Sequence, residues 1–282
     1  KSFQKGQFIV YNEALWSAKQ DITSEQSWKP EAWEKYTKHD YAEFNVAHTW
    51  TEYLNRLSGA VSGFMCLLLL IFSFKYTKRK DLRLLSVLVL LGMVFQAWLG
   101  ATVVFSVLAP HKITIHMLMA LVLVAWMIIY IERLKGDNIS ILKVSKSMKN
   151  LIYTFFALGI VQILLGTQVR QQTDEMMDAG ISRELIADGF DVTFFIHRSF
   201  SFLIVFAIGY LYLKLRTYIS IKRVLNYLII FTLVEVLAGI ILYYFGMQAY
   251  AQPIHLLLGL LIFSFFVELY LRLRTDLQSS SK

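Results

Sequence analysis

Seven long apolar segments constrain this chain more than any other feature. They lie near residues 54–74, 83–108, 112–132, 150–169, 193–214, 222–246 and 253–273. A helix of about 20 apolar residues crosses a bilayer core of about 30 Å, and these segments approach or exceed that length. Of the 282 residues, 56% are hydrophobic and only 17% are charged, values outside the range of ordinary soluble domains. The sequence therefore predicts an all-α, polytopic transmembrane helical bundle.

Lys and Arg residues are concentrated in alternate loops, which predicts the orientation of the bundle. The basic groups lie at 75–83, 133–149, 214–223 and 272–274. The intervening loops, at 109–111, 170–192 and 247–252, are poor in charge or mildly acidic. Cytoplasmic loops are enriched in Lys and Arg, so we expect a multi-pass protein of the plasma or inner membrane with a cytoplasmic C-terminus. This distribution accounts for the net charge of +8 without a nucleic-acid partner.

The first 50 residues are polar and aromatic, and this orientation puts them outside the cytoplasm. They contain no basic and then apolar signal sequence that would carry them across. We therefore expect a further helix upstream, which would make seven spans here and eight in the full protein. We divide the chain into an extracytoplasmic segment (1–50), an N-terminal half-bundle (51–135) and a C-terminal half-bundle (136–282). The stretch 170–192 is expected to be a loop with a short surface helix.

Matching stretches in the two half-bundles predict an internal repeat. Ile115-His116 and Ile254-His255 each open an apolar helix that closes in a Glu and an Arg-Leu pair. Asn55-Arg56 and His197-Arg198 each lie one turn inside a helix. Asn55 precedes His116 by 61 residues, and His197 precedes His255 by 58. Repeats of this kind are common in membrane proteins, so we expect two repeat-related four-helix halves.

His116, His197 and His255 lie at one depth, near the extracytoplasmic ends of their segments. Ionisable groups inside membrane spans are functional candidates. Two neutral imidazoles on opposite faces hold the iron of a b-type haem, and helical bundles bind such cofactors between facing helices. We interpret His197 and His255 as a pair of haem ligands. The alternative for each is a buried histidine hydrogen-bonded to a serine or a carbonyl group.

The first half offers His116 as a metal ligand together with a carboxylate. Glu52 and Asn55 share a helix face with His48, in the place equivalent to the ligands of the other half. This asymmetry predicts one permanently bound haem and one site that binds something transiently and reacts with it. Glu52 would act there as a base or stabilise developing positive charge. The alternative for Glu52 is an ion pair with Arg56.

Arg56 and Arg198 are expected to bind haem propionates, because a guanidinium group pairs bidentately with a carboxylate. The alternative is that both extend toward the lipid headgroups. Several glycines of the spans would allow close helix contact or make room for a flat macrocycle. They are Gly59, Gly63, Gly100, Gly166 and Gly239.

An ordered set of motifs resembles the haem A synthase family from about residue 41 onward. It comprises Glu52-Tyr-Leu-Asn-Arg56, Gln96-Ala-Trp-Leu-Gly100, Ile115-His116, Gln162-Ile-Leu-Leu-Gly166 through Arg170, Ile196-His197-Arg198 and Ile254-His255. Each motif alone is weak, whereas the ordered set is fairly specific. The resemblance implies eight helices in two four-helix halves. It also implies a haem-dependent membrane oxidoreductase that oxidises the C8 methyl group of haem O to a formyl group, giving haem A for terminal oxidases.

The resemblance further implies that haem b is held by His197 and His255, while His116 and the essential carboxylate Glu52 receive haem O. The family usually has a histidine where this chain has Asn55. The substrate iron would then be five-coordinate on His116, or His48 would supply its second ligand. Expected partners are the lipid bilayer, haem O, the haem O synthase and a second copy of the chain in a homo-oligomer. The electron donor is not indicated.

Two other functions compete with this interpretation. A non-catalytic b-type cytochrome that passes electrons to a partner would need two symmetric bis-histidine haems, and Asn55 counts against them. A transporter is disfavoured because the polar residues lie near the outer face and the spans lack helix-breaking pairs.

Overall fold

The computed structural model describes residues 8–11, 14–19, 21, 32–35, 46–105, 110–136 and 144–274. Within these ranges it has seven long helices, and all seven are long and apolar enough to span a membrane. They are α1 (Val46–Tyr76), α2 (Lys80–Phe105), α3 (Pro110–Leu134), α4 (Lys146–Asp178), α5 (Val192–Leu215), α6 (Ile219–Tyr244) and α7 (Ala251–Arg274). The predicted all-α polytopic architecture is confirmed, and the chain is a multi-pass membrane protein.

The chain separates into two compact units, residues 1–61 and 62–282. The first unit contains an antiparallel sheet of β1 (Phe8–Tyr11), β2 (Ala14–Ala18) and β3 (Trp33–Lys35), in that order. Ala18 pairs with Trp33, and both are buried in a small cluster with Ala32. We had no sequence-based expectation of this sheet, because strands of three to five residues are too short to show a clear alternation.

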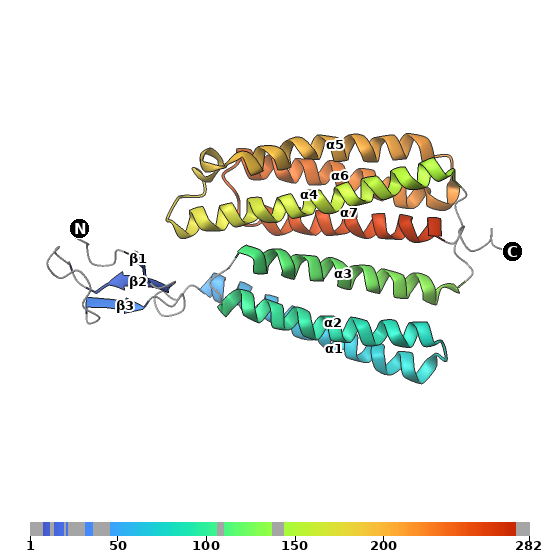
Figure 1. Cartoon of the computed structure of the whole chain (residues 1–282), viewed down its shortest axis with the longest axis horizontal. Helices are drawn as coiled ribbons and strands as arrows, with labels where there is room; N and C mark the ends of the chain where they lie inside the picture. The colour runs from blue at the N-terminus through green and yellow to red at the C-terminus, as the bar shows by residue number, and fades with distance from the viewer. Residues whose placement is uncertain are drawn as a thin grey trace. The chain divides into compact units, whose positions relative to one another are not determined.

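In the second unit, helices α2 to α7 run side by side with alternating direction (Figure 1). Helices α4 to α7 pack around one another, α2 packs on α3, and α3 contacts both α4 and α7. Because directions alternate, the three helices that carry His116, His197 and His255 all begin at the same end of the bundle (Figure 1).

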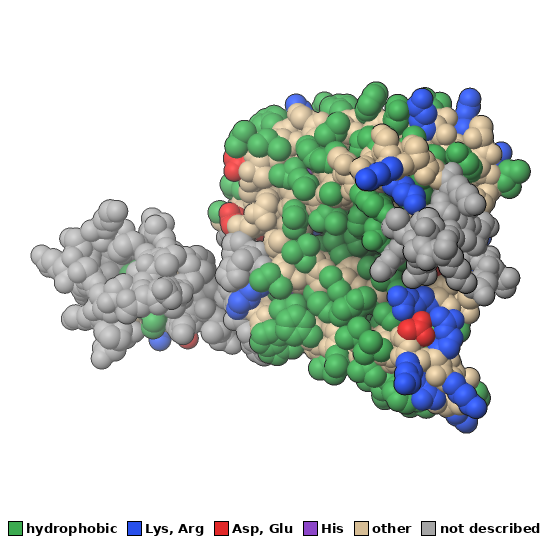
Figure 2. Space-filling view, turned by 45° about the vertical axis from the view of Figure 1, so that its right-hand side comes forward, with side chains coloured by type: hydrophobic (Ala, Val, Ile, Leu, Met, Phe, Trp, Pro, Cys, Tyr) green, Lys and Arg blue, Asp and Glu red, His purple; other side chains and the backbone are tan. Residues whose placement is uncertain are grey.

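Basic side chains gather toward the opposite end of the helical unit, while its flank is largely hydrophobic (Figure 2). Lys75, Arg133 and Lys214 lie in the last turns of α1, α3 and α5. A cation in the last helical turn also interacts favourably with the carbonyl end of the helix dipole. The separation of the basic end from the histidine end follows from the alternating loops of the sequence.

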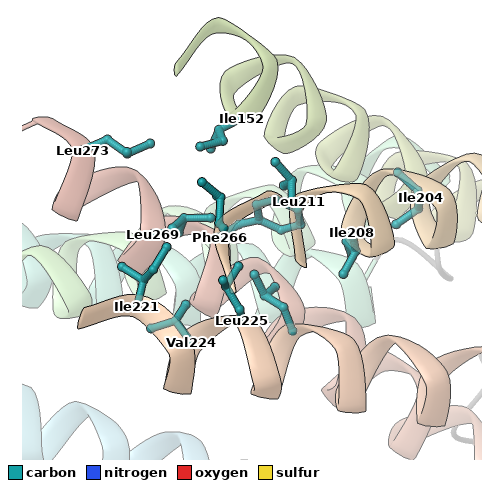
Figure 3. Close-up of a cluster of buried hydrophobic side chains, with 12 residues drawn as sticks. Ile152, Ile204, Ile208, Leu211, Ile221, Val224, Leu225, Phe266, Leu269 and Leu273 are labelled. Atoms are coloured by element: carbon teal, nitrogen blue, oxygen red, sulfur yellow. The ribbon is translucent and has the colours of Figure 1, made fainter. Parts of the chain in front are cut away.

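Among the described residues, the largest cluster of buried side chains lies toward the ends where α4 and α6 begin and where α5 and α7 finish, and on α5 it starts two turns beyond His197. Its members are aliphatic apart from one phenylalanine (Figure 3). They are Ile152, Ile204, Ile208, Leu211, Leu215, Ile221, Val224, Leu225, Leu228, Phe266, Leu269 and Leu273. Lipid tails are as apolar as leucine, so these contacts stabilise the bundle mainly through close packing and not through removal from water.

The helix that carries Gly166 is longer than expected. The sequence predicted a span ending at 169 followed by a loop, whereas α4 continues to Asp178. Side-chain pairs four residues apart support the added turns, with Arg170 bonded to Asp174 at 2.9 Å and Gln171 to Glu175 at 2.6 Å. The loop prediction was wrong for these residues because hydropathy marks where the apolar stretch ends and not where the helix ends. The expected short surface helix is a single 3-10 turn, η4 (Ile186–Gly189).

The start of α5, one turn before His197, is fixed by a capping residue. The Asp191 carboxylate accepts a hydrogen bond of 2.7 Å from the backbone N–H of Thr193, which satisfies a free donor of the first turn. A hydrogen bond from Gln172, together with this backbone bond, lowers the pKa of Asp191 below its usual value. Asp191 is therefore ionised at neutral pH and remains an acceptor for the helix.

Leu211 and Leu213 on α5 provide a matched test of the packed end. The side chain of Leu211 is 1% exposed, and that of Leu213 is 64% exposed. Leu211→Ala leaves a cavity, and we expect the unfolding free energy in detergent to fall by roughly 1–3 kcal/mol. Leu213→Ala should change it little, because lipid or detergent fills the space. Comparable losses of thermal stability in the two variants would contradict the assigned core.

Candidate functional site

The structure brings His197 of α5 and His255 of α7 close together, with their rings edge to face. Their ring centres lie 6.4 Å apart, with an angle of 80° between the ring planes. Two metal–nitrogen bonds of about 2 Å, with the distance from each nitrogen to its ring centre, add up to roughly 6 Å. The spacing would admit one metal ion between the two imidazoles, and it also lies within the range of an ordinary edge-to-face ring contact.

Each of the three histidines packs against a glycine of the helix before it in the chain. A Cβ added at Gly100 or Gly166 would lie 3.2 Å from Cε1 of the neighbouring ring, and one added at Gly239 would lie 3.4 Å away. The pairs are Gly100 with His116, Gly166 with His197, and Gly239 with His255. A larger side chain would push the ring away. These glycines were expected to allow close helix contact, and the group that comes close to each of them is an imidazole ring.

A polar side chain one turn before each glycine contacts the same histidine. Gln96 donates a hydrogen bond of 3.2 Å from Nε2 to the carbonyl oxygen of His116, and its Nε2 lies 3.3 Å from the ring Nε2. Gln162 donates to the carbonyl oxygen of His197 at 3.1 Å. These carbonyl oxygens lie near the start of a helix and already accept an intrahelical bond, so the added amide bond serves to hold the neighbouring helices in register at the histidines.

In the third case the polar residue is Glu235. Its Oε2 lies 3.2 Å from Nδ1 of His255, and the two side chains are only 20% and 28% exposed. Sequence reasoning missed Glu235, although a signal was present. The stretch Glu235-Val-Leu-Ala-Gly239 has the spacing of Gln96 and Gly100, and His255 follows Gly239 by sixteen positions, as His116 follows Gly100.

The chemistry of the pair suits a macrocycle-bound metal. Nδ1 of all three histidines is buried without a hydrogen-bond partner among the residues the structure describes. Iron would be held through the other ring nitrogen, Nε2, so Nδ1 is the atom that a neighbouring acceptor would fix. In the same part of the chain, no group of three or more His, Cys, Asp and Glu side chains could hold a bare metal ion. Two nitrogens suffice for haem iron, whose other four positions belong to the porphyrin.

The residues expected beside the substrate lie on α1. Glu52 forms an ion pair with Arg56, one turn away, and their side chains are 39% and 63% exposed. The alternative interpretation of Glu52 named this pair, so the catalytic role of Glu52 stays a prediction. Asn55 is exposed on the same helix. His48 belongs to the first turn of α1, and its side chain lies outside the described part of the chain.

Arg198 extends along the surface of α5. Its guanidinium carbon lies 5.2 Å from the ring centre of Phe195 and 5.9 Å from that of Phe194. This position is consistent with both earlier interpretations, a propionate partner or a group reaching for the headgroups.

A polar layer joins the two half-bundles beside the histidines. The hydroxyl groups of Thr114 on α3 and Thr167 on α4 lie 3.1 Å apart, and Gln168 donates to Thr114 at 3.2 Å. Thr114 lies two residues before His116, and Thr167 follows the glycine that contacts His197. The two candidate sites are thus connected through neighbouring turns of α3 and α4.

The comparison with known families agrees with this geometry. A model of COX15-CtaA, described as cytochrome oxidase assembly protein, matches residues 16–267, which is most of the chain. The chain belongs to this family. The suspected membership of the haem A synthase family is thereby confirmed. No single curated protein is similar enough to the chain to count as a match.

Two glycines of α4 allow the packing of His197 to be tested. In Gly166→Ala the new methyl group would press on the ring, and we expect roughly tenfold weaker haem binding, because small displacements of a ligand are costly. Gly159→Ala is the control, since a Cβ there meets no atom within 4 Å. The ratio of haem to protein after purification measures both. Full haem content in Gly166→Ala would contradict the contact.

Proposed function

We propose that this member of the cytochrome oxidase assembly family is a haem A synthase, an enzyme that oxidises the C8 methyl group of haem O to a formyl group. The observation that carries the proposal is the facing pair His197 and His255, 6.4 Å apart between ring centres, in a chain of this family. The proposal includes the orientation inferred from the basic loops, with the histidine end extracytoplasmic and the C-terminus cytoplasmic.

His197 and His255 would hold a b-type haem in the C-terminal half, residues 136–282. When bound, that haem supplies one-electron transfer. The chain's own contribution is to orient the ligands: Gln162 fixes the backbone at His197, and Gly166 and Gly239 let the neighbouring helices approach the two rings. Arg198 is the proposed partner of a propionate, because it is exposed on α5 next to a ligand.

The N-terminal half, residues 51–135, would receive haem O as substrate, with His116 as its ligand. Gln96 and Gly100 hold His116 as the corresponding residues hold His197, which supports an equivalent role. We propose that Glu52 moves protons at the reacting methyl group and that Arg56 pairs with a propionate. With Asn55 in place of the usual histidine, the substrate has a single firm protein ligand, unless His48 supplies a second.

The proposed oxidant is molecular oxygen. Each of two successive hydroxylations of the methyl carbon consumes one O₂, two electrons and two protons, and releases one water. The product of the second step carries two hydroxyl groups on one carbon, and loss of water from it leaves the aldehyde. The protons are the ones that a carboxylate such as Glu52 could deliver.

Removal of either ligand tests the b-haem site. We expect His197→Ala and His255→Ala each to abolish the bis-imidazole absorption spectrum of the purified protein, because one imidazole is lost from the iron. His116→Ala should leave that spectrum in place. A normal bis-imidazole signal in the His197 or His255 variant would refute the assignment.

Replacement of Glu52 tests the reaction itself. Glu52→Gln should retain the b-type spectrum while haem A formation falls by about 100-fold or more, because a general acid–base group contributes that much. Mass analysis of haem extracted from membranes that also produce haem O measures the product. Glu184→Gln, a change at an exposed carboxylate of the loop before α5, is the control. If no variant, nor the wild type, yields haem A, the alternative of an electron-passing cytochrome replaces the synthase.

A further inference from the structure

The three histidines have similar neighbours on the adjacent helix, but the polar side chain is a glutamine at two of them and a glutamate at the third. On α2 and α4 the polar residue one turn before the glycine is Gln96 or Gln162, and its amide donates to the carbonyl oxygen of the histidine. On α6 the same position is Glu235. A carboxylate has no N–H to donate, so Glu235 cannot repeat that bond.

The carboxylate instead lies against the ring. Oε2 of Glu235 and Nδ1 of His255 are both buried and lie 3.2 Å apart, and neither makes a hydrogen bond to any other residue within the described ranges. The other oxygen, Oε1, would lie 3.5 Å from a Cβ at Gly259. The carboxylate therefore lies against two successive turns of α7, at His255 and at Gly259. In the described part of the chain, no other carboxylate lies within ion-pair distance of any of the three histidines.

We propose that Glu235 is a positioning residue for the haem that His197 and His255 hold. It accepts the Nδ1 proton of His255, which fixes the tautomer that leaves Nε2 free for iron. A carboxylate acceptor also raises the basicity of the imidazole. When a haem is bound, His255 would therefore be the stronger donor of the two histidines, and the ferric state would be favoured over the ferrous state.

This inference rests on the b-haem part of the proposed function and is independent of the oxidation of haem O. It explains why the chain has glutamate where the other two helices have glutamine. A mere packing role would be filled equally well by the amide, which has the same shape.

The test is redox titration of the complete purified protein with its b haem bound. Glu235→Gln keeps the shape and restores the residue of α2 and α4. We expect it to retain haem while the preference for the ferric state falls about tenfold, which is about 59 mV toward positive potential for one electron. The g values of the ferric haem in electron paramagnetic resonance should shift as well. Glu235→Asp keeps the acceptor charge and should return the potential most of the way.

Glu268→Gln is the control, because Glu268 lies on the same bundle but pairs with Arg272, far along α7 from His255. It should leave both the potential and the g values unchanged. Wild-type values in Glu235→Gln, or equal shifts in the Asp and Gln variants, would overturn the positioning role while leaving the haem site intact. A wild-type protein without a bis-imidazole spectrum would instead refute the haem site on which the inference rests.

Discussion

The contact between an imidazole and a glycine on the adjacent helix organises the histidine end of this bundle. It occurs three times, and in each case the missing side chain lets two helices come close enough for a ring to lie in the interface. Where lipid supplies no hydrophobic force between helices, small residues and interhelical hydrogen bonds determine which faces meet. Both are present at these contacts, since a polar side chain lies one turn from each glycine. The positions of the three histidines therefore depend on helix packing and not on any loop.

The two ends of the bundle differ in the side chains that fill their helix interfaces. At the basic end, side chains such as Leu215, Ile221 and Leu269 are almost completely buried and contain no polar atoms. At the histidine end, the interfaces contain amides, hydroxyls and a carboxylate, several with unsatisfied atoms. Such atoms lower stability unless a ligand completes them. The well-packed end can hold the helices in register while the other end keeps polar groups available for a cofactor.

Much of this fold was predictable because membrane spans have a strong sequence signal. The seven helices, their alternating direction and the shared depth of the histidines follow from hydropathy and loop charge. The added turns of α4 could not be predicted in this way, because Arg170 to Asp178 are polar yet helical. Glu235 was missed for a different reason: it was not singled out from the sequence, because its role depends on its spacing from Gly239 and on its distance from His255. The repeat allowed the prediction that His197 and His255 face each other. The distance between their rings could be obtained only from the packed helices.

The length of α4 has a consequence for the surface at the histidine end of the bundle. At about 1.5 Å per residue, its 33 residues extend for about 50 Å, well beyond a bilayer core of about 30 Å. The final turns therefore stand in the headgroup layer or in water, and a hydrogen bond of 2.5 Å from Arg170 to Gln252 ties their base to the start of α7. At the histidine end, α4 therefore adds a polar helical surface beyond the apolar core of the membrane.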